Sequence, residues 1–313
     1  MAYAKAYSIL AALLLFACGA PTSKSDKEQS STNTPTFEAG TRRMPRVVEN
    51  FKQITTAEEY QYAVEHYWDG FDFDIGERVI EYDTTDICQA LATYVYLIEP
   101  HQAAQRLKSL MHRAERSRHT LDFFATVADI VLYDPNSPLR NDEYYIPILE
   151  VLSASPLLDE YDKLIPQHDL HIAKQNRIGR SANDFEFMLA DDSRMKLYDI
   201  DSEYTLLMFA NPDCPMCRAI IDDIESSVIL TQLIELERLQ VVAIYTDSDI
   251  AAWKRYLPAL PKSWIKGYDN ESISHNKLYN LRAIPSLYLL DSQKLVLIKD
   301  GTDIGHIEYV ISL

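Results

Sequence analysis

Residues 206–217 read LLMFANPDCPMC, and this stretch decides the fold of the carboxy-terminal part of the chain. Its first residues form an apolar run, as expected for a strand that is buried on both faces of a sheet. A short loop follows, and Cys214 and Cys217 stand where the next helix is expected to begin. The first turn of a helix has backbone N–H groups without partners, and these groups together with the helix dipole stabilise a thiolate. The stretch therefore predicts a reactive cysteine pair at the amino end of a helix.

The cysteine pair predicts thiol–disulfide exchange. Cys214, the first of the two, is expected to attack a substrate disulfide, and Cys217 is expected to resolve the mixed disulfide that results. Pro215 suits the first helical position because its φ is fixed near the helical value and its missing N–H has no partner to lose there. With Cys18 assigned to lipid chemistry, as argued below, only this pair and Cys88 remain, so a disulfide scaffold is excluded.

Strand and helix signals alternate on both sides of the motif, from about residue 180 to the end of the chain. This order predicts an α/β domain with a mixed central sheet. The expected strands are 185–189, 196–198, 204–210, 239–245, 287–290 and 294–299. The expected helices are 218–239 (continuous or in two parts), 250–257, 275–280 and 304–313.

A proline that leads into an apolar strand, Pro285, completes a recognisable arrangement. Together with the CPMC motif it resembles the thioredoxin fold, in which a cis-proline loop faces the C-x-x-C motif. The resemblance implies that Pro285 is the cis proline and that Ile284 offers backbone hydrogen bonds to an extended substrate segment. Residues 182–313 look like the TlpA/ResA-like branch of membrane-tethered thiol–disulfide oxidoreductases. In that case the Cys214–Cys217 pair is the redox centre and no other cofactor is expected.

The sequence departs from this family pattern at two positions. Asp213 replaces the usual aromatic residue before the first cysteine, and its charge is expected to oppose thiolate formation at Cys214, although it could also cap the helix or take part in proton transfer. Met208 lies near the strand position at which thioredoxin itself has a buried carboxylate. Proton handling is therefore expected to differ from that of thioredoxin.

Two other functions compete with redox catalysis. Met216, between the cysteines, could complete a soft Cu(I) site, although a C-x-x-C metal site normally has two more ligands and none is adjacent in the sequence. The domain could also be a peptide-binding scaffold without catalysis. We expect no metal site, because the histidine pair His168 and His171 has no third ligand nearby in the sequence.

The first forty residues are expected to lie outside the folded part. Residues 1–17 resemble a lipoprotein signal peptide, and Leu15-Phe16-Ala17-Cys18 resembles a lipobox, which implies that Cys18 is lipidated. An ordinary cleaved signal peptide is the alternative. Residues 18–40 are rich in Ser, Thr, Lys and Pro and are expected to be a flexible tether. This organisation predicts a location in the cell envelope, lipid-anchored to a membrane and facing the periplasm or the outside.

Residues 41–178 are expected to form an all-helical domain, and residues 179–313 the thioredoxin-like domain. In the first, a capped start at Thr55 or Thr56 precedes expected helices at 85–98, 100–116, 120–132, 142–153 and 157–177. Cys88 lies among apolar residues, which favours an inert thiol. The aromatic pair Tyr144-Tyr145 and the run 71–74 could line a groove or belong to a core. Substrate docking, dimerisation and positioning relative to the membrane remain open as roles of this domain.

The overall charge limits the partners. A formal net charge of −17 argues against nucleic acid, because binding phosphates requires a basic face. The expected partners are protein or peptide thiols and disulfides in the envelope, a redox partner that the sequence does not identify, and the membrane through the lipid anchor. Whether the protein acts as a reductant, an oxidant or an isomerase cannot be read from the motif, since two intervening residues only partly set its potential.

Overall fold

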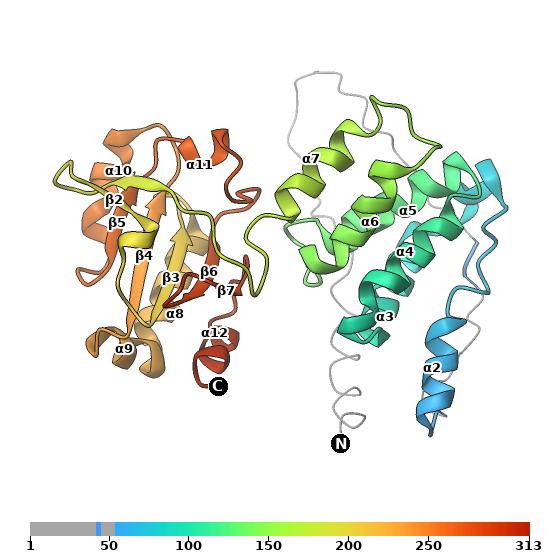
Figure 1. Ribbon diagram of the computed structural model, residues 1–313, viewed down its shortest axis with the longest axis horizontal. Helices are drawn as coiled ribbons and strands as arrows, with labels where there is room; N and C mark the ends of the chain where they lie inside the picture. Colours follow the sequence, from blue (N-terminus) through green and yellow to red (C-terminus); the bar gives the residue numbers. More distant parts are fainter. Residues whose placement is uncertain (1–41, 45–53) are drawn as a thin grey trace, which may run out of the picture. The chain divides into compact units, whose positions relative to one another are not determined.

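The computed structural model describes residues 42–44 and 54–313, in two compact units that divide between Gln167 and His168 (Figure 1). The predicted signal peptide, Cys18 and the tether lie outside the described residues. Within the described part of the chain, no helix is both long enough and apolar enough to cross a membrane.

The first unit is helical, as predicted. Thr56 begins the first helix with a capping box, in which its side chain accepts from the backbone of Glu59 and the Glu59 carboxylate accepts from the backbone of Thr56. The elements are α2 (Ala57–Glu65), η3 (Gly76–Glu81), α3 (Thr84–Leu97), η4 (Pro100–Gln102), α4 (Ala103–Ala114), α5 (Arg118–Leu132), α6 (Asp142–Ala154) and α7 (Leu164–Ala173), the last of which crosses the division between the units.

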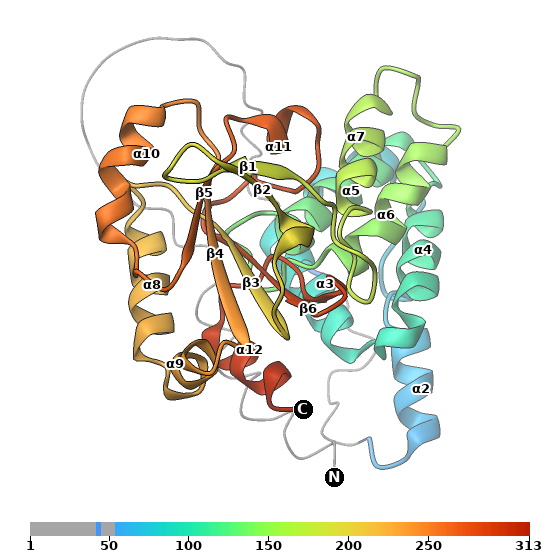
Figure 2. The same ribbon diagram turned by 60° about the vertical axis from the view of Figure 1, so that its left-hand side comes forward.

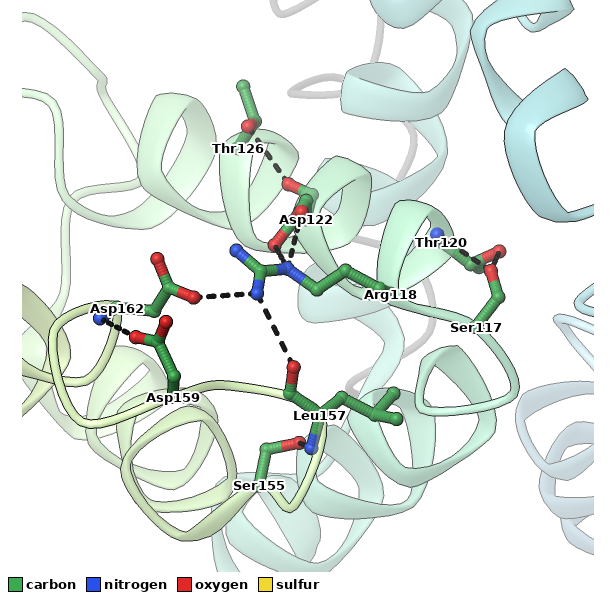
Figure 3. Close-up of polar contacts among 9 residues, drawn as sticks. All are labelled: Ser117, Arg118, Thr120, Asp122, Thr126, Ser155, Leu157, Asp159 and Asp162. Atoms are coloured by element: carbon green, nitrogen blue, oxygen red, sulfur yellow. Dashed lines mark hydrogen bonds and ion pairs between the residues drawn. The ribbon is translucent and has the colours of Figure 1, made fainter.

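The expected helix over residues 157–177 is shorter in the structure, because the segment before α7 is folded as a turn. Asp159 accepts a hydrogen bond from the backbone N–H of Asp162. Arg118 of α5 holds this turn from the side: its Nη1 donates to the Asp162 carboxylate at 2.7 Å and to the carbonyl oxygen of Leu157 at 3.3 Å (Figure 3). Its Nε contacts Asp122 at 2.7 Å. These contacts hold the turn that precedes α7.

The aromatic run at residues 71–74 belongs to the core of this unit. Phe71 and Phe73 are buried with their ring centroids 4.8 Å apart, and both rings pack against Phe124 of α5. The intervening Asp72 and the following Asp74 are exposed. The alternation of aromatic and acidic residues therefore reflects packing on one side and solvent on the other.

The second unit contains a mixed sheet, as predicted, and the sheet has seven strands, one more than expected. The strand order is β2-β1-β5-β4-β3-β6-β7; β3, β4 and β5 are parallel to one another, and the other neighbouring pairs are antiparallel. Figure 2 shows β3 and β4 side by side. The bounds are β1 (Glu186–Met188), β2 (Arg194–Lys196), β3 (Tyr204–Phe209), β4 (Leu239–Tyr245), β5 (Ile265–Tyr268), β6 (Ser286–Asp291) and β7 (Val296–Ile298).

Alternating side chains of the buried strands face two cores. Leu206 and Met208 pack with the buried side of α8 (Pro215–Ser226), whereas Leu207 and Phe209 belong to the core on the other face, with Phe187. This alternation explains why β3 is apolar at each position from Leu206 to Phe209. The remaining elements are η5 (Leu197–Asp199), α9 (Val228–Glu235), α10 (Ile250–Tyr256), η6 (Leu257–Ala259), α11 (Ser272–His275) and α12 (Ile304–Ile311).

Three predicted elements of this unit have other bounds in the structure. The helix expected over 218–239 begins at Pro215 and is interrupted at Ser227, whose side chain caps the start of α9. The strand expected at 196–198 lies at 194–196, and η5 follows it. The helix expected at 275–280 lies at 272–275, with the left-handed φ of Lys277 close behind its end.

Strand β5 was not predicted at all, because its sequence lacks an apolar run. Lys266 lies within it and donates from Nζ to the carbonyl oxygens of Leu257 and Leu260, at 3.1 and 2.9 Å. Burial lowers the pKa of this lysine. Its ammonium group is thus held by the negative ends of two backbone carbonyl dipoles.

Candidate redox site

The predicted cysteine pair lies at the amino end of α8, directly after the strand β3 and a short loop. Cys214 is the N-cap residue of α8, Pro215 occupies the first turn, and Cys214 and Cys217 form a disulfide with their Cα atoms 5.2 Å apart. Cys217 is fully buried, whereas Cys214 is half-buried. The backbone N–H of Cys217 donates to Sγ of Cys214 at 3.0 Å. This donor would favour a thiolate on Cys214 after reduction.

The predicted proline loop faces the cysteines. The peptide bond between Ile284 and Pro285 is cis, and the carbonyl oxygen of Ile284 lies 3.6 Å from Sγ of Cys214. A disulfide sulfur carries no proton, so this is a close contact in the oxidised form and becomes a thiol hydrogen bond only after reduction. Within the part of the chain that the structure describes, no backbone–backbone hydrogen bond uses Ile284. The backbone of Ile284 is thus not engaged by the sheet or by a turn of the described chain.

The three residues expected to modulate the motif are all exposed. Met216 has an exposed fraction of 60% and lies on the surface beside the disulfide. Asp213 does not cap α8, because Cys214 occupies the N-cap position. Its negative charge does reach the end of the neighbouring strand β4: burial raises the pKa of Tyr245 first, and the charges of nearby carboxylates, including Asp213, raise it further.

Two buried polar side chains near the motif were missed by sequence reasoning. Asn211 precedes the motif by three residues, and its Oδ1 is buried without a hydrogen-bond partner among the described residues. Ser286 follows the cis proline, is fully buried, and its Oγ likewise has no partner in the described chain. Ser286 pairs with Phe209 at the end of β3, so both residues belong to the end of the sheet that carries the motif. The signal in the sequence that could have identified these two residues is a polar residue at the border of an apolar strand.

A third missed residue is Asp269, which follows β5. It is 5% exposed; its Oδ2 accepts from the backbone of Ile273 at 2.9 Å, and its Oδ1 has no partner among the described residues. Burial raises the pKa of Asp269 to about 6, against the lowering effect of the Ile273 hydrogen bond. Carboxyl ends of parallel strands share one edge of a sheet, so Asp269 lies at the same edge as the cysteines. Met208, in contrast, is fully buried in the apolar cluster that contains Cys217.

The described residues contain no group of three or more His, Cys, Asp or Glu side chains that could hold a metal ion. His168 and His171 are both exposed on α7, where His171 lies 3.3 Å from Gln175 and His168 lies 3.3 Å from Lys277. Cys88 of α3 is half-buried.

Comparisons with known proteins agree with the two-part architecture. A family model described as Domain of unknown function (DUF5106) matches residues 17–176, and one described as Thioredoxin-like matches residues 201–296. A crystal structure of a thioredoxin-like protein from Bacteroides caccae is 33% identical and has a TM-score of 0.78, with 89% of this chain and 99% of that chain covered. None of the curated proteins matches the sequence.

Two further structures cover only part of the chain. The carboxy-terminal domain of an uncharacterized protein from Bacteroides fragilis is 37% identical, with 44% of this chain and 99% of that chain covered and a TM-score of 0.43. A domain of a possible thiol-disulfide isomerase from Cytophaga hutchinsonii is 22% identical, with 44% and 97% covered and a TM-score of 0.36.

Proposed function

We propose that this chain, which belongs to the family of thioredoxin-like proteins that carry the DUF5106 domain before a thioredoxin-like domain, is a thiol–disulfide oxidoreductase of the cell envelope. The observation that carries the proposal is the contact between the motif and the proline loop. Sγ of Cys214 lies 3.6 Å from the carbonyl oxygen that precedes the cis proline. A substrate sulfur that approaches Cys214 beside this loop would meet the backbone groups of Ile284.

The two cysteines would act in sequence. The thiolate of Cys214 attacks one sulfur of a substrate disulfide; the substrate S–S bond breaks, and its electron pair leaves on the other substrate sulfur, which takes up a proton. Cys217 then loses its proton and attacks Sγ of Cys214, which releases the second substrate thiol and forms the Cys214–Cys217 disulfide. Two electrons and two protons pass to the substrate, and the reverse sequence oxidises a dithiol.

The surroundings of the motif support this division of roles. Cys214 is the more accessible sulfur and receives the N–H of Cys217, whereas Cys217 is fully buried and can be reached only from Cys214. Ile284 and Pro285 would bind the substrate backbone, and Asp213, Pro215 and Met216 would modulate reactivity. No cofactor is needed in this scheme. We further propose that Cys18 is lipidated and tethers the protein to a membrane, with envelope proteins or peptides as substrates.

Thiol counting by mass in glutathione or dithiothreitol buffers tests this function. We expect a reversible two-electron transition of the Cys214–Cys217 pair, with Cys88→Ser behaving like the parent protein. Cys214→Ser should abolish turnover of a peptide disulfide, whereas Cys217→Ser should accumulate a mixed disulfide on Cys214. Full activity of the Cys214→Ser protein would contradict this mechanism. If the Cys214–Cys217 pair shows no reversible transition and the protein retains Cu(I), the metal-binding alternative would be favoured.

A further inference from the structure

The helical unit has a pocket of about 400 Å³ where the carboxy end of α3 meets the amino end of α6. Three tyrosines contribute to its wall, Tyr60 of α2, Tyr96 of α3 and Tyr144 of α6, together with apolar residues such as Pro100 and Leu139. Tyr60 is fixed in place because its hydroxyl donates to the carbonyl oxygen of Leu97 at 2.5 Å. Three of the residues that line the pocket are therefore aromatic, and the face of an aromatic ring carries partial negative charge.

The charge that the pocket offers to a ligand is negative. Glu99 lines it, and within the described residues no hydrogen bond or ion pair engages the Glu99 carboxylate. That charge reaches the pocket wall: burial raises the pKa of Tyr144 first, and the negative charge of Glu99 raises it further. Arg140 also lines the pocket, but it already has an interaction partner within the chain.

The two helix ends at the pocket differ in whether charged side chains of the helix offset the helix dipole. The carboxy end of a helix is the negative end of its dipole, and α3 has no basic residue in its last turn. The amino end of α6 is positive, but Asn141 caps it by accepting from Glu143, and Asp142 and Glu143 occupy its first turn. The Tyr60 hydroxyl satisfies the carbonyl oxygen of Leu97 at this end of α3, but no basic residue of its last turn offsets the negative end of the dipole, which favours a cationic ligand.

We propose that this pocket binds a lysine or arginine side chain of a protein partner. The apolar stem would lie against Pro100 and Leu139, and the cationic head would lie near Glu99 and the tyrosine rings, where cation–π attraction adds to the ion pair. The choice of a protein partner rests on the proposed function, since thiol–disulfide exchange needs protein or peptide substrates. The pocket would then assign substrate docking to the helical unit.

Fluorescence anisotropy with the full chain tests the proposal. The probe is a labelled short peptide of Gly, Ser and Lys, compared with the same peptide in which norleucine replaces each Lys and so keeps the stem without the charge. We expect the Lys peptide to bind more tightly and its binding to weaken with added salt. Glu99→Gln should raise its dissociation constant about three- to tenfold, and Glu99→Lys should raise it further.

Glu77→Gln is the matched control, because Glu77 is an exposed carboxylate of the same unit outside the pocket lining. It should bind the Lys peptide like the parent protein. Equal affinity for the Lys and norleucine peptides, or unchanged affinity after Glu99→Gln, would overturn the proposal. The probes contain no cysteine, so a Cys214→Ser chain should still bind them. Loss of redox activity and loss of docking are therefore separate outcomes.

Discussion

At the scale of single residues, the redox site is shaped by unequal surroundings of two identical side chains. Cys214 is half-buried and accepts an N–H at 3.0 Å, whereas Cys217 lies in an apolar cluster that includes Met208. A negative charge on sulfur is therefore better stabilised at Cys214. Asp213, the exposed residue directly before Cys214, is expected to act in the opposite direction, because a carboxylate repels negative charge on a nearby sulfur.

Asp213→Asn should therefore make the reduced protein more reactive. Without the carboxylate charge, more of Cys214 is expected to be thiolate. Because the two groups interact through solvent, the rate of alkylation of Cys214 by iodoacetamide at pH 7 is expected to rise only about two- to fivefold. Mass spectrometry of the modified peptide follows Cys214 separately from Cys88. Asp222→Asn, the same change at an exposed position further along α8, is the control and should leave the rate unchanged. A slower reaction after Asp213→Asn would instead indicate a role in proton transfer.

Asp269 predicts a dependence of stability on pH. Burial raises its pKa from 3.8 to about 6, so the folded protein binds this proton more tightly than the unfolded chain. The stabilisation is therefore present below pH 4 and is lost as the pH rises through 6. Asp269→Asn keeps an oxygen for the backbone of Ile273 but cannot titrate. Its free energy of unfolding, relative to the parent, should increase by about 1–3 kcal/mol between pH 4 and pH 7.

Urea unfolding at several pH values measures this difference. Asp223→Asn, at an exposed position on α8, should show no such change between pH 4 and pH 7. A constant difference between Asp269→Asn and the parent protein across that range would mean that Asp269 titrates alike in the folded and unfolded states.

A site residue could be predicted from the sequence when the residues that determine its chemistry are close to it in the chain. Cys214 and Cys217 could be found because the motif itself contains the chemistry and the helix start, and Pro285 could be found through the resemblance to the thioredoxin fold. Asp269 could not, because its raised pKa arises from burial by segments distant in sequence and its polar neighbours form no motif. Asn211 and Ser286 are similar cases, since a polar residue at a strand border is ordinarily solvated.

At the scale of elements, long apolar strands were predicted and short ones were not. β3 and β4 are buried on both faces and their apolar runs are visible in the sequence, with β4 found at residues 239–245 as expected. β5 has only four residues, one of them Lys266 and one Gly267, and it is a strand because β4 and β1 pair with it. Tertiary pairing, not local pattern, decides such a strand.

Gly267 gives a test of how tightly β5 is packed. A Cβ at this position would meet Ile244 Cδ1 and would lie 2.5 Å from Phe187 Cδ2. Gly267→Ala should therefore lower the free energy of unfolding by about 1–3 kcal/mol, through overpacking of the core between these side chains. Gly305→Ala, at an exposed position in α12, is the control and should be neutral or stabilising because alanine favours helix. Equal effects in urea unfolding would show that β5 adapts without cost.

At the scale of the whole molecule, the chain combines two compact units whose border lies within α7. The sequence favours a border between residues 178 and 179, and that border stays a prediction. In the structure, the segment after Gln167 makes its polar contacts with the thioredoxin-like unit. Lys299 of that unit donates from Nζ to the carbonyl oxygens of Ala173 and Gln175, both at 2.7 Å. Lysine at this place also complements the negative end of α7.

Asn176 is the most buried polar residue of this segment. Its Nδ2 donates to the carbonyl oxygen of Leu278 at 2.7 Å, and its Oδ1 accepts from the backbone of Asn183 at 2.6 Å. Asn183 in turn donates from Nδ2 to Gln175 at 2.9 Å. Residues 173–176 therefore satisfy groups that would otherwise be left unpaired at the start of the thioredoxin-like unit.

Two fragments distinguish these borders. Residues 164–313 keep α7 whole, whereas residues 179–313 begin at the border that the sequence favours. We expect the longer fragment to be more stable by about 2–4 kcal/mol, because the shorter one leaves several buried donors and acceptors without partners. Asn176→Ala in the longer fragment should reproduce part of this loss of stability, about 1–3 kcal/mol. Both fragments should have the same reduction potential, since the cysteine pair and the proline loop lie in each. Urea unfolding with equal midpoints for the two fragments would place the functional border at residue 179 and make α7 part of the helical unit alone.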